Sequence, residues 1–181
     1  MTTTPSILVF DVNETLIDIE SIAPLFQRIF GDKRVLREWF AQLVLYSNAF
    51  TLSGLYTTFF SLGQGLLEML GRIPNVSVTP SDIDELRTLM MTMPAHPDVE
   101  EGLEQLKEAG FRMMTCTNSP PNANGNSPIE RAGPAHYFER QFSVDTVRAF
   151  KPAQQVYHTV ARETAKPSKL HFGVQGGTLR I

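Results

Sequence analysis

The most constraining feature of the sequence is the run Ile7–Phe10, four apolar residues that lead without alternation into Asp11. An unbroken apolar run of this length is typical of a strand that is buried on both faces. In open α/β sheets ligands bind outside the carboxyl ends of the strands, so Asp11 is expected in a binding crevice. A partly desolvated carboxylate there can attack an electrophilic carbon or phosphorus and form a covalent ester. The open alternative is that Asp11 only caps the following turn.

The next part of the chain, from about Ile19 to Met93, has helical periodicity. Apolar residues recur at helical spacing through it, and Gly31 is expected to end the first helix. The segment Thr79–Asp82 has the pattern of a helix start, with a hydroxyl cap, a proline in the first turn and an acid near the positive end of the dipole. We therefore predict a helical insertion over residues 19–93 rather than a second strand unit.

After the insertion the pattern changes to helices that alternate with apolar runs. Strands are expected at Phe111–Cys116, Phe142–Val144 and Leu170–Val174, and helices from Pro97 to Gly110, from Ile129 to Phe138 and from Pro152 to Thr164. This order predicts an α/β fold, in which a parallel sheet core with crossover helices (residues 1–18 and 94–181) carries a helical cap subdomain (residues 19–93) inserted after the first strand.

Composition narrows the possible partners and compartments. The 181 residues carry a net charge of -3, so there is no electrostatic argument for binding nucleic acid or an anionic membrane. The single cysteine, Cys116, excludes an internal disulfide framework and a multi-cysteine metal site. The first residues lack the features of a signal peptide, and no apolar run approaches the roughly 20 residues that cross a bilayer. A cytoplasmic location is therefore expected.

Three short motifs occur in order around the expected cap. They are Asp11-Val12-Asn13-Glu14-Thr15-Leu16, then Thr117-Asn118-Ser119-Pro120, then Lys151-Pro152-Ala153-Gln154-Gln155-Val156-Tyr157. Together, over roughly residues 6–172, they resemble the haloacid dehalogenase superfamily, and most closely the type II (S)-2-haloacid dehalogenases. The resemblance implies a Rossmann-like core and a homodimer that acts on a small 2-halocarboxylate and water without a metal or other cofactor.

The resemblance also implies roles for single residues. Asp11 is expected to be the nucleophile, Thr15 to hold its turn, and Lys151 to balance the charges of Asp11 and the substrate. The residues expected to bind the substrate are Asn13, Phe60, Thr117, Asn118 and Tyr157. From the residues alone, purely structural interpretations stay open. Thr117 and Asn118 could be turn formers, Lys151 could be a solvated lysine, and Phe60 and Tyr157 could belong to the core.

Asn13 distinguishes between two branches of the superfamily. Phosphatases of this superfamily carry a second aspartate at this position, which protonates the leaving group. Asn13 has no ionisable proton, and a halide leaving group needs none. Dehalogenation is therefore favoured over the alternative, a phosphatase-like hydrolase of the same fold.

The sequence departs from the dehalogenase pattern in three places. The cap segment Leu45–Phe50 lacks the arginine that usually helps to bind substrate and halide, although Tyr46 and Asn48 could line a pocket. The tail from Val174 to Ile181 contains no acid that could activate the hydrolytic water. Asn122–Pro128 stands where a regular helix start is expected. We therefore expect that the last strand and helix of the family pattern are missing and that catalytic turnover is impaired. A non-catalytic remnant of the fold is kept as a further alternative.

Overall fold

The computed structural model describes residues 6–73, 75–120, 127–164, 170–174 and 177–180. Its strands are β1 (Ile7–Phe10), β2 (Arg112–Thr117), β3 (Arg140–Ser143), β4 (Leu170–Val174) and β5 (Gly177–Arg180). Its α-helices are α1 (Ala23–Phe30), α2 (Val35–Leu52), α3 (Phe59–Arg72), α4 (Pro80–Thr92), α5 (Val99–Glu108), α6 (Pro128–Ala132) and α7 (Gln154–Thr164). Short 3-10 helices are η1 (Ile19–Ile22), η2 (Pro134–Tyr137) and η3 (Val144–Thr146).

The five strands form one sheet with the order β3-β2-β1-β4-β5. The first four are parallel, with β1 in the middle between β2 and β4, which confirms the predicted parallel core. Residues 177–180 form a strand that the sequence analysis did not predict. They pair antiparallel with β4 at that edge of the sheet.

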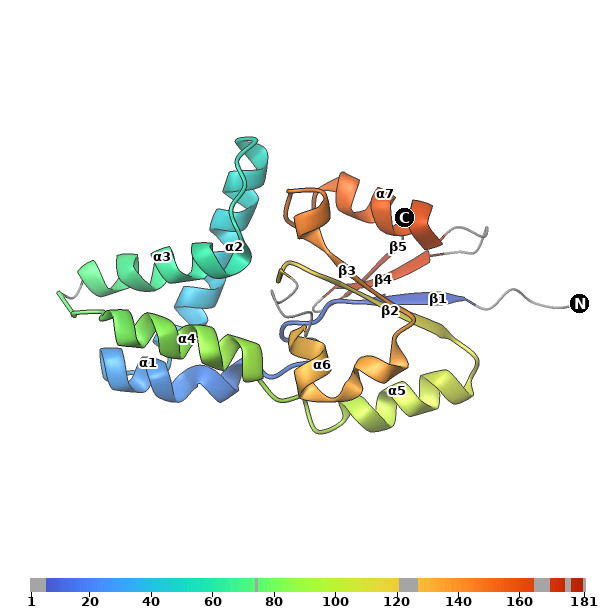
Figure 1. The fold of residues 1–181 in the computed structure, drawn as a ribbon, viewed down its shortest axis with the longest axis horizontal. Helices are drawn as coiled ribbons and strands as arrows, with labels where there is room; N and C mark the ends of the chain where they lie inside the picture. Colours follow the sequence, from blue (N-terminus) through green and yellow to red (C-terminus); the bar gives the residue numbers. More distant parts are fainter. Residues whose placement is uncertain (1–5, 74, 121–126, 165–169, 175–176, 181) are drawn as a thin grey trace, which may run out of the picture.

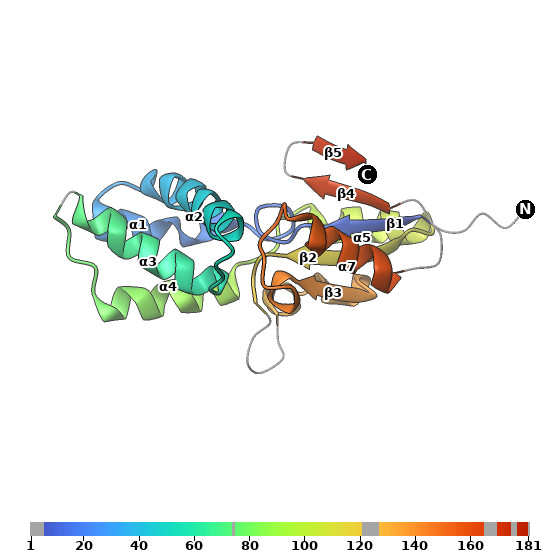
Figure 2. The ribbon, with the colours of Figure 1, turned by 90° about the horizontal axis from the view of Figure 1, so that it is seen from above.

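Helices cover both faces of the sheet. Figure 1 shows α7 on one side of the strands and α5 and α6 on the other, as expected for crossover connections. The four helices α1–α4, here called the cap helices, form a separate layer beyond one end of the strands (Figure 2). The α/β class with an inserted helical unit after the first strand is therefore confirmed. No helix in the described ranges is long and apolar enough to cross a membrane.

Local signals explain where the cap helices begin and end. Gly31 closes α1 with a φ of 74°, a conformation that glycine adopts without steric cost. The sequence predicted a helix start with a hydroxyl cap at this point, and Thr79 and Asp82 form a reciprocal capping box at the start of α4. The Thr58 side chain accepts a hydrogen bond from the Ser61 N–H and so caps α3.

One predicted helix is divided into two. The segment Ile129–Phe138 forms α6 and then η2, because Gly133 adopts a φ of 110° and Pro134 cannot donate a backbone hydrogen bond. The irregular stretch before it lies mostly outside the described residues. Its last two residues, Ser127 and Pro128, start α6 regularly, with a capping box to Glu130.

Two neighbouring linkers join the cap helices to the sheet. The Asp18 N–H donates to the Pro94 carbonyl at 2.9 Å, and the His96 N–H donates to the Leu16 carbonyl at 3.0 Å. Contacts farther out also tie the two parts together. The Tyr56 hydroxyl donates to Asp145, and Arg37 of α2 lies 2.5 Å from Glu14, in the turn that follows β1. The cap helices are thus held over the carboxyl ends of β1 and β2.

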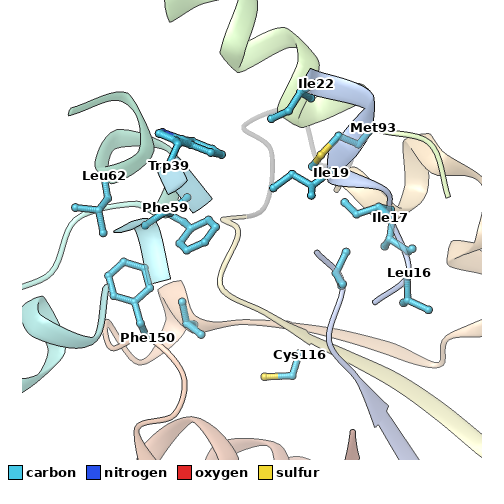
Figure 3. Close-up of a cluster of buried hydrophobic side chains, with 14 of the residues drawn as sticks. Leu16, Ile17, Ile19, Ile22, Trp39, Phe59, Leu62, Met93, Cys116 and Phe150 are labelled. Atoms are coloured by element: carbon cyan, nitrogen blue, oxygen red, sulfur yellow. The ribbon is translucent and has the colours of Figure 1, made fainter. Parts of the chain in front are cut away.

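The hydrophobic core is continuous from the sheet into the cap helices. Figure 3 shows Trp39, Phe59 and Leu62 of the cap beside Phe150 of the core, with Cys116 of β2 nearby. The rings of Phe59 and Phe150 lie 6.0 Å apart between their centres. Because apolar packing spans the junction, a carboxylate between the cap helices and the sheet is only partly exposed to water.

Candidate active site

The centre of the site is Asp11, which follows the last residue of β1. Its Oδ1 atom accepts two hydrogen bonds, from Lys151 Nζ at 2.5 Å and from the Val12 N–H at 2.7 Å. Within the described part of the chain, no donor reaches its other oxygen, Oδ2. One oxygen is therefore held in place while the other is available to attack, which is the arrangement that a carboxylate nucleophile needs.

Three hydrogen bonds fix Lys151, which lies in the loop that leads into α7. Its Nζ donates to Asp11 and, at 2.9 Å, to the Cys116 carbonyl at the end of β2. Its backbone N–H donates to Asn118 Oδ1 at 3.0 Å. The Lys151 side chain is only 15% exposed, so it is not a solvated surface lysine. Its ion pair with Asp11 is partly desolvated.

Asn13 and Thr117 stabilise the two turns that carry the site. Asn13 Nδ2 donates to Ser119 Oγ at 3.0 Å, in a buried contact between the turn after β1 and the turn after β2. Thr117 Oγ1 accepts from the Ser119 N–H at 3.0 Å, as the turn-former reading expects. Both side chains therefore position the backbone on which Asp11 and Asn118 are mounted.

A cavity of about 220 Å³ lies between these turns and the cap helices. It is smaller than the roughly 300–1,000 Å³ of sites that hold drug-sized ligands, so it suits a small substrate. Its polar or titratable wall residues are Asp11, Asn13, Asn48, Cys116, Asn118, Lys151 and Tyr157, and its apolar ones are Val9, Phe10, Phe40, Val44, Phe59 and Pro152.

The structure brings together most of the residues that the sequence singled out. Asp11, Asn13, Asn118, Lys151 and Tyr157 all line this cavity.

Three expected site residues lie elsewhere among the described residues. Thr117 and Thr15 do not line the cavity, and the buried Thr15 Oγ1 has no hydrogen-bond partner there. Phe60 faces α4, where the Arg87 guanidinium lies 4.6 Å from its ring centre, and its neighbour Phe59 lines the cavity instead.

Sequence reasoning missed part of the cap side of the wall. Phe40, Val44 and Asn48 of α2 are spaced four residues apart, which places them on one face of the helix. Asn48 was named from the sequence as a residue that could line a pocket, and it does line the cavity. Its amide at the end of an apolar stripe is the signal that could have found Phe40 and Val44.

Burial raises the pKa of two titratable wall groups. It raises the pKa of the Cys116 thiol from 9.0 to about 11; the Lys151 charge opposes this shift and the Asp11 charge adds to it. Burial also raises the pKa of the Tyr157 phenol, with smaller contributions from Cys116 and Asp11. At neutral pH neither group adds a negative charge to the cavity.

The raised thiol pKa predicts a pH dependence of stability. Between about pH 9 and 11 the unfolded thiol loses its proton while the native thiol keeps it, so the free energy of unfolding should fall as pH rises, by up to about 3 kcal/mol. Urea unfolding at about pH 8 and pH 10 measures this fall, and Cys116→Ala, the matched control, should show a smaller one. Equal falls in both proteins would contradict the assignment.

Comparison with known proteins places this site in a family. A model of haloacid dehalogenase-like hydrolases matches residues 5–172. The chain belongs to this family. An (S)-2-haloacid dehalogenase of Pseudomonas putida is 23% identical over 162 residues, which cover 88% of this chain and 72% of that protein.

Solved structures agree on the fold. The L-2-haloacid dehalogenase of Xanthobacter autotrophicus, solved with chloropropionic acid covalently bound, has a TM-score of 0.82 at 23% identity and covers 93% of this chain. The L-2-haloacid dehalogenase RSc1362 has a TM-score of 0.84 at 25% identity and covers 94%. The chain in turn spans 69% and 78% of these two structures. The family fold of a haloacid dehalogenase-like hydrolase is thus present over nearly all of the chain.

Proposed function

We propose that this family member is a hydrolase of carbon–halogen bonds that acts on small 2-haloalkanoic acids. Asp11 Oδ2 attacks carbon 2, the carbon–halogen bond breaks, and the halide leaves with the bonding electrons. Water then attacks the acyl carbon of the Asp11 ester, which releases a 2-hydroxy acid and a proton and regenerates the Asp11 carboxylate. The observation that carries the proposal is the Asp11 carboxylate, held by Lys151 at one oxygen and open at the other, in a small and mostly apolar cavity.

Asn13 supports a halide rather than a phosphate-ester leaving group. Its amide is bound to Ser119, and it supplies no proton to a leaving alkoxide. Lys151 supplies the cation beside the reacting carboxylate, and Asn118 and Tyr157 are the substrate-facing polar groups of the wall. The proposal needs no metal ion.

The residues of the cavity wall support ester formation better than they support hydrolysis of the ester. Among the described residues that line the cavity, none is a histidine and none besides Asp11 is an acid. Activation of water by a neighbouring base contributes typically 10²–10⁴-fold to such a step. We therefore infer that the ester forms faster than it is hydrolysed.

Intact-mass spectrometry after incubation with 2-chloropropionate tests the proposal. We expect the protein to gain the mass of one propionate unit on ester formation, and the adduct to persist because hydrolysis is slow. Asp11→Asn, which keeps the shape of the side chain, should show no adduct. Rapid halide release without an adduct would show that water is activated after all, and the absence of both adduct and halide would overturn the proposal.

The cellular compartment, the oligomeric state and the domain bounds are also proposals. We propose a cytoplasmic homodimer in which a core of residues 1–18 and 94–181 carries a cap of residues 19–93. The support for a dimer is a set of exposed large apolar residues on the cap, Leu45, Leu52, Leu55 and Ile73. Light scattering coupled to size-exclusion chromatography tests the dimer, with Leu45→Lys expected to weaken it; a monomer at all concentrations would reject it.

A further inference from the structure

The loop that carries Lys151, residues 144–151 and here called the lysine loop, is held from two sides. On the sheet side, the Lys151 N–H donates to Asn118 Oδ1 at 3.0 Å and its Nζ donates to the Cys116 carbonyl at 2.9 Å. On the cap side, residues 51–59, which run from the end of α2 to the start of α3, contact the same loop. Two separate parts of the fold therefore meet at the lysine loop.

Thr51 makes the cap contact that lies nearest to Lys151 in the chain. It stands in the last turn of α2, and its Oγ1 accepts a hydrogen bond from the Phe150 N–H at 3.0 Å. Phe150 is fully buried, so its N–H needs an acceptor from the protein itself. Since Phe150 directly precedes Lys151, a shift of this peptide moves the backbone from which the lysine side chain reaches Asp11.

Tyr56 contacts the lysine loop at three further points. Its hydroxyl donates to Asp145, and its ring centre lies 5.2 Å from that of Phe150. The guanidinium carbon of Arg148 lies 5.1 Å from the centre of the tyrosine ring. Arg148 has a φ of 52°, a left-handed conformation that is unfavourable for any residue except glycine and persists where the surroundings impose it. The cap thus supports the part of the lysine loop whose backbone is least relaxed.

These contacts lie outside the cavity. Among the described residues, the cavity wall includes neither Thr51 nor Tyr56, so an effect of either on the reaction has to pass through another residue. Phe59 continues the same contact surface into the wall, since it lines the cavity and packs on Phe150 (Figure 3). The lysine loop is therefore the direct connection between this part of the cap and the reacting carboxylate.

We propose that Thr51 and Tyr56 are positioning residues of Lys151. They hold the lysine loop so that the ammonium meets Asp11 Oδ1 at 2.5 Å. The inference rests on the proposed function, because the step concerned is formation of the Asp11 ester. A displacement of about 1 Å at a reacting centre costs up to about 100-fold in rate, even when the altered residue is remote. The competing interpretation is that the sheet-side contacts alone fix Lys151 and that the cap residues only stabilise the fold.

The experiment measures ester formation in a single turnover by intact mass at rising concentrations of 2-bromopropionate. Thr51→Val keeps the shape of the side chain and removes the acceptor. It should lower the maximal rate by about tenfold and change the half-saturating concentration by less than about twofold. Thr51→Ser keeps the hydroxyl and should restore the rate to within about threefold. Thr88→Val makes the same change at an exposed position of α4, and as the matched control it should leave both values unaltered.

The Lys151→Met background separates positioning from a structural role. If Thr51 acts through Lys151, adding Thr51→Val to Lys151→Met should slow the reaction by less than about twofold, whereas an independent effect would again cost about tenfold. Tyr56→Phe is a second variant that keeps the ring contacts with Phe150 and Arg148 and removes only the hydroxyl. It should slow the unaltered protein by about threefold and leave the rate of Lys151→Met unchanged.

The outcomes are separable. No adduct in the unaltered protein would overturn the proposed function and this inference with it. An adduct that forms in Thr51→Val at a maximal rate within about twofold of the unaltered protein would overturn the inference alone, as would a full additional loss in the Lys151→Met background. Circular dichroism of each variant verifies folding at the temperature of the assay.

Discussion

Lys151→Met is expected to reduce the rate of ester formation on Asp11 by about 100- to 1,000-fold. The ammonium lies 2.5 Å from Asp11 Oδ1 and holds that oxygen, while no donor among the described residues reaches Oδ2. Methionine fills a similar volume but offers neither the charge nor the hydrogen bonds, so Asp11 loses its orientation. The rate is measured by intact mass in a single turnover with 2-bromopropionate.

Lys151→Arg is the matched control for charge. It keeps the cation, but a planar guanidinium cannot reproduce the two contacts from one nitrogen to Asp11 and the Cys116 carbonyl. Its rate should lie between those of the unaltered protein and Lys151→Met. A Lys151→Met rate within a few-fold of the unaltered protein would show that the backbone alone positions Asp11.

Stability measurements show whether the loss is chemical or structural. Removing one partner leaves the other charge partly buried, so Lys151→Met should lower the free energy of unfolding by about 1–3 kcal/mol. Combining it with Asp11→Asn should recover part of that loss, since the double variant leaves no unpaired charge. The loss of reaction rate is expected to be far larger than this change in stability explains.

The sheet and the cap helices could be predicted because their signals are local. The unbroken apolar run before Asp11 predicted β1, and the Thr79–Asp82 pattern predicted the capped start of α4. The antiparallel pairing of β5 depends on a partner strand, and the short segment carries no signal of its own that fixes it. The break at Gly133-Pro134 was visible in the sequence but was not weighed against the helical pattern on either side.

The site was predictable only in part, for a geometric reason. Lys151 and Asp11 are 140 residues apart, and no local pattern shows that a lysine before a proline reaches the first strand. The resemblance to the haloacid dehalogenases supplied that expectation. Phe59 and Phe60 are adjacent, and consecutive helical side chains point about 100° apart, so only tertiary structure decides which one faces the cavity.

The packing of the cap makes Trp39→Ala the substitution with the largest expected loss of stability. The indole is fully buried, its ring centre lies 5.4 Å from that of Phe26, and its Nε1–H donates to the Gly63 carbonyl at 2.8 Å. Truncation leaves a large void and removes the hydrogen bond of the indole, so we expect the free energy of unfolding to fall by about 3–5 kcal/mol. Urea unfolding followed by circular dichroism measures it, because Trp39 is the only tryptophan.

Gly63 shows how closely the indole fits and provides a second test of the same contact. A Cβ atom at this position would lie 2.9 Å from Trp39 Cζ2, so Gly63→Ala should destabilise by about 1–3 kcal/mol through overpacking. Trp39→Phe removes the part of the ring that collides, so the double variant should lose less stability than the sum of the two single ones. If the losses of stability from Gly63→Ala and Trp39→Phe were strictly additive, the helices α2 and α3 would be free to move apart. This packing would then not fix the part of the cavity wall that α2 supplies.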